Sequence, residues 1–562
     1  MQHPHASSRT LSRHGRAERQ ISICRPHATA FSGKGHAGGA SSVSVSAATV
    51  DRAPSAVASS YVSQDARKAL FNPAIEQAEE APCALVSGSL PGWLQGSLFF
   101  NGCGEYTGME HLFDGYSVLV KLRFSGGRVF GRQRYLDSDA YRHFKSTGRM
   151  RYREFATAPK AQGLGGALLG LYDTLSAAVQ LGRIFTDNAS VSFTPLPGGR
   201  MLALSEAVTS AYVIDSASLE TRQHVAYKDG VKGDLQSAHP KIAPDGSIIN
   251  FSHSFPFGGL HVSAMDPVSL QRREIAFIKD RDNVACWSHD IALTARHAVV
   301  VEHPTVMSME ALALGRPAQY AFMNWQPEAG TRVHVVALDG SGVVTHTAPP
   351  FFTFHFSNAF EQPAAAGGSG FEICVDLSVY DDPQILNDLR VDALTAFPGS
   401  EIAPSRLARL TIPLTDAAGG AVGPCALAAP VPLLKDDSAY GNYIEFCAFN
   451  PQYRFKPYRY TYGTAAVRPT NMANALAQHD TQAGTSRVWH EPGSMLSEPS
   501  FVPRPGATEE NDGVILSLLT CGNGGGSQLL VLDGRTFTET ARVQLPFTVP
   551  FRFHGAYVEG QQ

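Results

Sequence analysis

The sequence predicts an all-β fold, and three observations lead to this prediction. From about Ala66 onward the chain carries short apolar runs with the composition of strands, namely SLFFNG, YSVLVKLRF, HAVVVEH, VHVVAL, FEICVDL, VILSLL and QLLVLDG. Turn sequences separate them, among them SGGR, APDG, LDGSG and NDG. Long amphipathic helices are almost absent, so the rhythm is that of many short antiparallel strands.

The architecture follows from the size of this all-β region. About 500 residues of strands need an arrangement without open sheet edges, and four-stranded blades repeated around an axis provide one. We therefore predict that residues 61–562 form a single β-propeller domain. No kelch or WD40 type of repeat is visible, so the residues alone do not give the number of blades.

Residues 1–60 differ in composition from the rest of the chain. The first 50 residues contain one acidic residue, Glu18, and end in the Ser-, Ala- and Gly-rich run GGASSVSVSAATV. Their basic residues are Arg9, Arg13, Arg16, Arg19, Arg25 and Lys34. This composition is typical of a transit peptide followed by a disordered linker, and the Ser and Ala content favours a chloroplast over a mitochondrion. A disordered tail without a targeting role is the alternative.

One segment, residues 163–185, breaks the strand pattern. Its sequence GLGGALLGLYDTLSAAVQLGRIF places leucines at helical spacing, while Asp173 and Arg183 argue against a membrane-spanning helix. Two interpretations stay open: an amphipathic element that makes peripheral contact with a membrane surface, or a helix packed on the protein's own core.

Charge and cysteine content exclude several classes of function. The 46 Lys and Arg residues balance 50 Asp and Glu residues, for a formal net charge of -4, so no basic field is available to bind nucleic acid. The eight cysteines are too widely spaced for a CxxC site and too few for a disulfide framework, and we expect free thiols.

Histidines beside turns are the candidate metal ligands. Most of the 20 histidines of such a chain are surface or hydrogen-bonded core residues, but four lie in strand-like surroundings next to a turn. These are His239 in SAHPKIAPDG, His289 in CWSHDIALT, His355 in FFTFHFSNAFE and His554 in PFRFHGAYVEG. Neutral imidazole suits Fe, Cu and Zn. The four are 50, 66 and 199 residues apart, so they could meet only where separate blades converge on the propeller axis.

The same reasoning does not remove every other histidine. His253 in FSHSF and His303 in VEHPT also adjoin strand-like runs, and His297 lies in the run before His303. Composition alone leaves these residues open as ligands.

Several motifs, taken in order, resemble the carotenoid cleavage oxygenase family. They are LFFNGCGEYTGMEHLFDGYSVLVKLRF, FTDNAS, SAHPKIAPDG, HDIALT, PPFFTFHFSNAFE, SEPSFVPRPGA with NDGVILSL, and FRFHG, and they cover the chain from about residue 85. The resemblance implies a seven-bladed propeller with iron on its axis and a helical and loop cap over a substrate tunnel. It also implies one Fe²⁺ per chain on His239, His289, His355 and His554, and selects against His253, His297 and His303.

The family also has glutamates hydrogen-bonded to the iron-ligating imidazoles. The matching positions are Glu206 in LALSEAV, Glu445 in NYIEFCAF and Glu498 in LSEPSF. A carboxylate that accepts the outer ring N–H fixes the tautomer and makes the ligating nitrogen more basic. The alternative for each glutamate alone is a solvated charge at the end of a strand.

The resemblance implies a dioxygenase that uses O2 as co-substrate and inserts both oxygen atoms across a conjugated C=C bond. No catalytic residue beyond the iron centre is expected, because the metal supplies the chemistry and the protein positions the substrate. The C-terminal stretch from YIEFCAF is similar to members that act on β-apo-10'-carotenal. They convert the 9-cis isomer to carlactone in strigolactone biosynthesis, or the all-trans isomer to β-apo-13-carotenone.

This sequence departs from those members at TAAVRPTNMANAL and in residues 160–185, which leaves the substrate open. A different carotenoid specificity, an isomerohydrolase or a stilbene-cleaving oxygenase would keep the same iron site. A propeller that binds partners without catalysis is the alternative from another class.

Overall fold

The computed structural model describes residues 60–159, 185–254, 258–281, 285–314, 318–364, 370–415 and 419–560. The predicted transit peptide and nearly all of the predicted element at 163–185 lie outside these residues. All described residues fall within one compact unit, residues 52–562.

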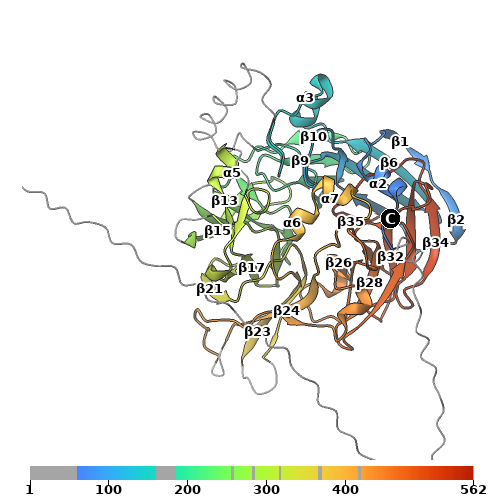
Figure 1. The fold of residues 1–562 in the computed structure, drawn as a ribbon. Helices are drawn as coiled ribbons and strands as arrows, with labels where there is room; N and C mark the ends of the chain where they lie inside the picture. Colours follow the sequence, from blue (N-terminus) through green and yellow to red (C-terminus); the bar gives the residue numbers. More distant parts are fainter. Residues whose placement is uncertain are drawn as a thin grey trace, which may run out of the picture. The chain divides into compact units, whose positions relative to one another are not determined.

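The described strands form seven antiparallel blades arranged in a ring, as Figure 1 shows. The first blade contains β1 (Gln77–Pro82), β6 (Arg128–Tyr135), β5 (Tyr116–Ser125), β3 (Gly96–Phe100) and β35 (Gly555–Glu559), with β4 (Cys103–Glu105) beside β5. The second contains β7 (Ser192–Leu196), β8 (Arg200–Leu204), β9 (Ala211–Asp215) and β10 (Thr221–His224). The third contains β11 (Leu235–Gln236), β12 (Lys241–Ile242), β13 (Ile248–Ser254), β14 (Gly259–Met265) and β15 (Arg272–Ile278).

Four further blades complete the ring. The fourth contains β16 (Ile291–Leu293), β17 (His297–Glu302), β20 (Thr331–Ala337) and β21 (Val343–Ala348). The fifth contains β22 (Phe356–Pro363), β23 (Phe371–Val379), β24 (Arg406–Pro413) and β25 (Val431–Pro432). The sixth contains β26 (Glu445–Phe449), β27 (Tyr460–Ala465), β28 (Ala475–Asp480) and β29 (Thr485–His490). The seventh contains β30 (Met495–Leu496), β31 (Ser500–Pro503), β32 (Gly513–Thr520), β33 (Ser527–Asp533), β34 (Glu539–Gln544) and β2 (Ala84–Gly88).

The ring closes through an exchange of strands between its first and last blades. The C-terminal strand β35 pairs with β3 in the first blade, from Gly96 opposite Glu559 to Phe100 opposite Gly555. Strand β2, the second strand of the described chain, pairs with β34 in the last blade. Both ends of the propeller are thereby tied into blades built mainly from the other end, which joins the two ends of the ring by hydrogen bonds.

Alternation of apolar side chains explains how the blades stack. In β32 every residue is buried, because both faces of the strand are covered. Leu516 and Leu518 pack toward the first blade with Val120 of β5, whereas Ile515 packs on the other face with Tyr462 of β27. The apolar run VILSLL is therefore an interior strand between two neighbouring blades.

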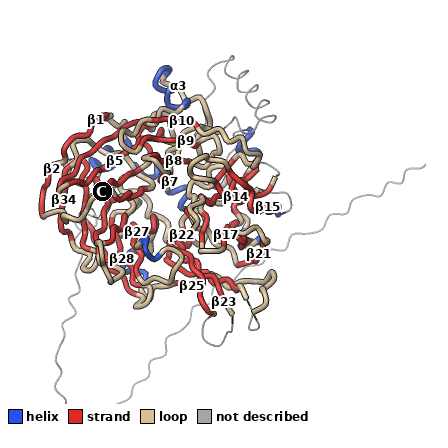
Figure 2. The backbone as a smooth tube through the Cα atoms, turned by 180° about the vertical axis from the view of Figure 1, so that it is seen from behind, coloured by secondary structure: helices blue, strands red, loops and turns tan. Residues whose placement is uncertain are grey.

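The cap predicted over one face is present. Helices α2 (Gln64–Phe71), α6 (Ile385–Asp388) and α7 (Val391–Thr395) lie over the face seen in Figure 1, and Figure 2 shows the ring from behind. Further short elements are α3 (Asp139–Thr147), α5 (Met309–Leu314), the hairpin of β18 (Thr305–Met307) and β19 (Met323–Trp325), and the 3-10 turns η3 (Pro327–Ala329), η4 (Asp437–Tyr440) and η5 (Pro451–Tyr453).

The position of the cap follows from strand direction. The hairpin with α5 is inserted between β17 and β20, and α6 and α7 are inserted between β23 and β24. In each blade the connection into the first strand and the connection from the second strand to the third leave on one face, since neighbouring strands are antiparallel. Insertions in these connections therefore gather on that face. Across the part of the chain that is described, no helix has the length and apolar character needed to cross a bilayer.

Candidate metal centre

The structure brings His239, His289, His355 and His554 together at the centre of the ring. Each lies one or two residues before the inner strand of its blade, ahead of β12, β16, β22 and β35 respectively. All four are buried, and one ring nitrogen from each lies within 4.8 Å of those of the others. The Nε2 atoms of His239 and His289 are 3.0 Å apart, and those of His289 and His355 are 3.3 Å apart.

Burial sets the protonation state of two of these histidines. The pKa values of His239 and His355 lie well below the ordinary value, first because burial disfavours the charged ring and then because neighbouring imidazoles repel a second charge. Neutral rings keep a lone pair on the nitrogen that faces the centre. Several such lone pairs so close together fit a bound cation, and imidazole donors suit iron, copper and zinc.

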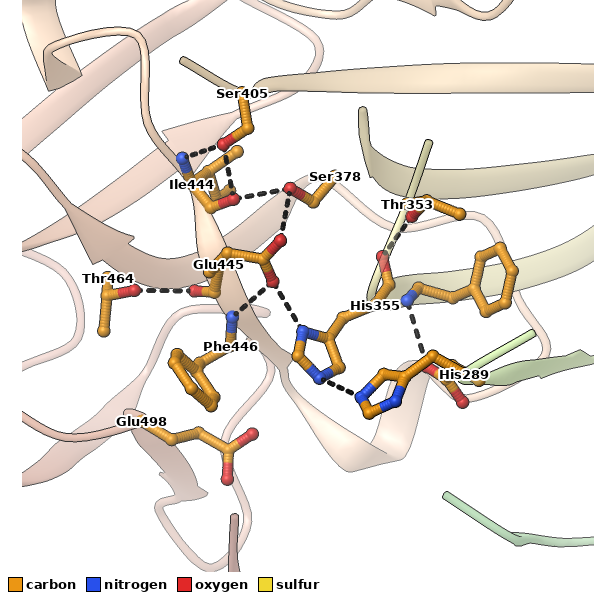
Figure 3. A network of polar contacts seen from close by, with 12 residues as sticks. His289, Thr353, His355, Ser378, Ser405, Ile444, Glu445, Phe446, Thr464 and Glu498 are labelled. Atoms are coloured by element: carbon orange, nitrogen blue, oxygen red, sulfur yellow. Dashed lines mark hydrogen bonds and ion pairs between the residues drawn. The ribbon is translucent and has the colours of Figure 1, made fainter. Parts of the chain in front are cut away.

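Three glutamates orient three of these rings. Glu206 Oε1 lies 2.5 Å from His289 Nδ1, Glu445 Oε2 lies 2.5 Å from His355 Nδ1, and Glu498 Oε1 lies 2.9 Å from His554 Nδ1. A carboxylate can only accept, so each Nδ1 carries the proton and each Nε2 presents its lone pair to the centre. Figure 3 shows the Glu445–His355 pair and the contact of His355 with His289.

The second oxygen of each carboxylate is also held. Glu206 Oε2 accepts from the indole N–H of Trp287 at 3.2 Å, and Glu445 Oε1 accepts from the Ser378 hydroxyl at 3.1 Å. Glu498 Oε2 accepts from the backbone N–H of Gly555, the residue after His554, at 2.6 Å. Burial raises the pKa of Glu445 to about 7. Two donors per carboxylate fix its orientation, and with it the direction of the imidazole.

Backbone and hydroxyl groups hold the segment of the fourth histidine, His239. Its backbone N–H donates to the Ser237 hydroxyl oxygen at 3.0 Å, and that hydroxyl donates to the carbonyl of His289 at 2.7 Å. Ser237 therefore connects the segments of two of the histidines.

All seven blades contribute one residue to this arrangement. The histidines come from the first, third, fourth and fifth blades, and the glutamates from the second, sixth and seventh. Glu206 follows β8, Glu445 begins β26, and Glu498 lies between β30 and β31. The four histidines and Glu206 lie in connections that open on the capped face. Glu445 lies at the start of a first strand, and Glu498 lies in the break between two segments that both pair with β32. Residues so far apart in sequence therefore meet at one end of the blades.

A cavity opens beside this centre, and His289, His355 and His554 form part of its wall. The rest is mainly apolar and comes from the cap and the capped face of the ring. Its aromatic members are Phe113, Phe155, Phe185, Trp287, Phe322, Phe354, Tyr380, Tyr443, Phe446, Phe551 and Phe553. The Phe113 ring lies nearly parallel to the His289 ring, at an interplanar angle of 9° and a centroid distance of 6.4 Å.

The sequence did not identify these lining residues. The composition contains 31 Phe and 18 Tyr, and most of them are ordinary core residues. Closeness in sequence to a candidate histidine could have indicated some of the lining residues. Three of them lie within two residues of such a histidine, namely Trp287, Phe354 and Phe553. In an extended segment, residues two apart project to the same side, so Trp287 accompanies His289 toward the centre.

The three other histidines considered are engaged elsewhere. His253 Nε2 lies 2.7 Å from Asp280, and His297 Nδ1 lies 2.9 Å from Glu361. His303 is buried, which lowers its pKa to about 3, and its ring packs 5.0 Å from that of Phe352. Among the described residues, the metal-compatible cluster contains the four predicted histidines and none of these three.

Comparison with known proteins identifies the family. Residues 71–559 match the family described as RPE65, retinal pigment epithelial membrane protein. The chain is 34% identical over 485 residues to carotenoid cleavage dioxygenase 8, chloroplastic, of Arabidopsis thaliana, covering 84% of this chain and 83% of that protein. The chain belongs to the carotenoid cleavage dioxygenase family. This match confirms the predicted resemblance to the family. The members named here are carotenoid cleavage dioxygenases, so the prediction that the chain is an enzyme is confirmed as well.

Two further relatives extend the comparison. The chain is 35% identical to carotenoid cleavage dioxygenase 8 homolog B, chloroplastic, of Oryza sativa subsp. japonica, over 84% of this chain and 82% of that protein. The cobalt-substituted structure of a Synechocystis apocarotenoid oxygenase superposes with a TM-score of 0.71 at 24% identity. The superposition covers 89% of this chain and all of that one, which supports the propeller fold of the family.

Proposed function

We propose that this member of the family is a non-haem Fe(II) dioxygenase that cleaves a conjugated C=C bond of an apocarotenoid. One iron per chain would be held by His239, His289, His355 and His554. The observation that carries the proposal is the convergence of four buried imidazoles, within 4.8 Å of one another, on the wall of a large apolar cavity. A metal centre and a lipophilic substrate would thereby share one space.

The chain's own residues perform the positioning. The imidazoles present neutral nitrogen donors, and Glu206, Glu445 and Glu498 hold the outer ring protons. The aromatic and aliphatic walls exclude water and hold an extended polyene beside the centre. Bound Fe(II) supplies the activation of O2, so that both oxygen atoms enter the cleaved bond and two carbonyl products form. No side chain needs to act as a general acid or base.

The proposed substrate is β-apo-10'-carotenal. Conversion of the 9-cis isomer to carlactone, in a strigolactone-type pathway, is the leading reaction, and cleavage of the all-trans isomer to β-apo-13-carotenone is the second. The second reaction is the insertion of one O2 across one C=C bond. The first would take up a second O2 and rearrange the cleaved product, because carlactone carries three oxygen atoms. Support comes from identities of 34% and 35% to two carotenoid cleavage dioxygenase 8 proteins and from the mainly apolar walls of the cavity.

Metal and product analysis together test the function. Purified protein loaded anaerobically with Fe(II) should hold one iron per chain, and incubation with each isomer under ¹⁸O2 should give labelled carbonyl products by mass spectrometry. Protein that binds iron but converts neither isomer would point to another specificity within the family. Protein that binds no iron after anaerobic loading would favour a non-catalytic binding scaffold.

We also propose that residues 1–60 direct import into the chloroplast, because of their Arg- and Ser-rich, acid-poor composition and because both rice and Arabidopsis relatives are chloroplastic. A fluorescent protein fused behind residues 1–60 should accumulate in plastids, and a diffuse cytosolic signal would contradict the proposal. Peripheral membrane contact through residues 163–185 is tested by liposome flotation of the full chain and of a variant lacking that segment.

A further inference from the structure

Trp287 connects the wall of the cavity to the metal centre. It lies two residues before His289 in an extended segment, so both side chains project to the same side. Its indole N–H donates to Glu206 Oε2 at 3.2 Å, while Glu206 Oε1 accepts from His289 Nδ1 at 2.5 Å. One carboxylate therefore links the indole to the imidazole.

The indole is held firmly in this place. Its ring is 3% exposed and packs among cavity-lining rings, with centroid distances of 6.1 Å to Phe155 and 6.0 Å to Phe354. Phe352 lies nearly parallel to it, at 15° and 6.1 Å. The backbone N–H of Trp287 donates to the carbonyl of Thr305 at 2.9 Å. A side chain fixed in this way can fix the carboxylate that it contacts.

Trp287 differs from the donors that hold the other two carboxylates. Ser378 holds Glu445 through a hydroxyl, and Gly555 holds Glu498 through its backbone N–H. Of these three donors, Trp287 is the one that also lines the cavity. A substrate lying in the cavity would contact the indole ring, whereas it would not reach Ser378 or Gly555.

We propose that Trp287 is a positioning residue that couples the substrate-binding wall to the metal ligand His289 through Glu206. The indole N–H holds the Glu206 carboxylate in the orientation in which it accepts from His289, and the ring of the same residue forms the surface for the polyene. This inference rests on the iron site proposed above, and its first test needs no substrate.

The test compares two cavity-wall variants. Trp287→Phe keeps an aromatic ring but removes the N–H. Phe155→Leu removes a cavity-lining ring that packs 6.1 Å from Trp287 and leaves the N–H contact with Glu206 in place. Metal-free proteins are titrated with Fe(II) or Co(II) against a competing chelator. We expect W287F to weaken metal binding about 10-fold, the lower end of the effect of losing a partner outside the ligand shell, and to shift the visible absorption of bound Co(II). F155L should keep the wild-type affinity and spectrum while it raises the KM for the polyene.

A double-substitution cycle separates coupling from packing. In a Glu206→Gln background the amide cannot link the two donors in the same way, so adding W287F should cause no further loss of metal affinity. Additive losses would overturn the proposal, as would a W287F protein with wild-type affinity and spectrum.

If circular dichroism shows that W287F does not fold, benzothienylalanine at position 287 replaces the N–H by sulfur in a ring of the same shape, and wild-type metal affinity in that protein would overturn the proposal. Wild-type protein that binds neither metal would refute the iron site itself, and with it this coupling.

Discussion

Single residues at the centre differ in how they are held, and this determines what their replacement does. Changing His239, His289, His355 or His554 to Ala removes one imidazole donor from a buried cluster of four. We expect each variant to lose bound iron and activity while its β-rich circular dichroism persists, because the propeller is built by strand pairing elsewhere.

His253→Gln is the matched control for those four variants. His253 is buried like them, but it lies 2.7 Å from Asp280 and outside the cluster. The control should keep its iron and activity, although loss of the contact with Asp280 will lower thermal stability. A ligand variant that retains full activity and iron content would remove that histidine from the proposed set.

The glutamates allow a graded prediction. Glu445→Gln keeps the shape of the side chain but loses the charge that makes His355 more basic, and Glu445→Ala also loses the hydrogen bond. Fe(II) retention and activity should therefore fall in the order wild type, Gln, Ala, by about 10- to 100-fold overall. The same order is expected for Glu206 and Glu498. Gln variants at all three positions that match wild type in both measurements would show that these contacts do not affect the metal.

At the scale of single residues, the sequence alone predicted only part of the site. His289 and His253 both lie beside strand-like runs, and composition could not separate them; the family motifs did. Trp287 remained unrecognised because the value of an indole N–H depends on which acceptor the fold brings near it. That acceptor, Glu206, lies 81 residues away in the chain.

At the scale of elements, Glu361 joins two blades. It lies on β22 of the fifth blade and accepts from Thr294, Arg296 and His297 around the start of β17 in the fourth. Burial alone would raise the pKa of Glu361, but hydrogen bonds from His297, Arg296 and Thr294 outweigh burial and lower the pKa to about 2. A carboxyl group whose pKa is lowered on folding stabilises the folded state above its unfolded pKa, and this stabilisation is lost as the pH falls.

Glu361→Gln tests this blade-to-blade contact. At pH 7 the variant should lose about 2 to 3 kcal/mol of unfolding free energy. A pKa lowered from 4.5 to about 2 corresponds to about 3.5 kcal/mol at about 1.4 kcal/mol per pH unit, and solvent screening at the exposed Arg296 reduces this value. The difference from wild type should shrink as the pH falls from about 4.5, the pKa of an unperturbed glutamate, toward about 2. Urea unfolding at a series of pH values measures it, and a difference that does not change with pH would show that charge contributes nothing there.

The strands themselves were predictable, whereas several other elements were not. YSVLVKLRF and VILSLL became β5 and β32 because apolar residues dominate both faces of an interior blade strand. Helices α6 and α7 contain four and five residues, which is too short for a helical period to show in a sequence. The partners of β2 and β35 could not be foreseen, because pairing across the whole length of the chain leaves no local signal.

At the scale of the whole molecule, the exchange of strands between the first and last blades predicts that truncation at the C-terminus destabilises the fold more than truncation at the N-terminus. Removal of residues 555–562 deletes β35, which pairs with β3 along its full length, and should prevent cooperative folding. Removal of residues 1–59 leaves every described strand in place and should preserve the fold and iron binding. Calorimetry and size-exclusion chromatography of both proteins measure the contrast, and a stable, iron-binding protein without β35 would contradict it.

The distribution of the centre over seven blades has a consequence for damaged protein. Because each blade supplies one histidine or glutamate, no stretch of chain shorter than residues 206–554 contains the whole set. A single proteolytic cut between residues 206 and 554 divides the set between two fragments. A metal ion bound at this centre would therefore mark molecules that are uncut between residues 206 and 554, and the ratio of bound metal to protein in a preparation would follow the undamaged fraction.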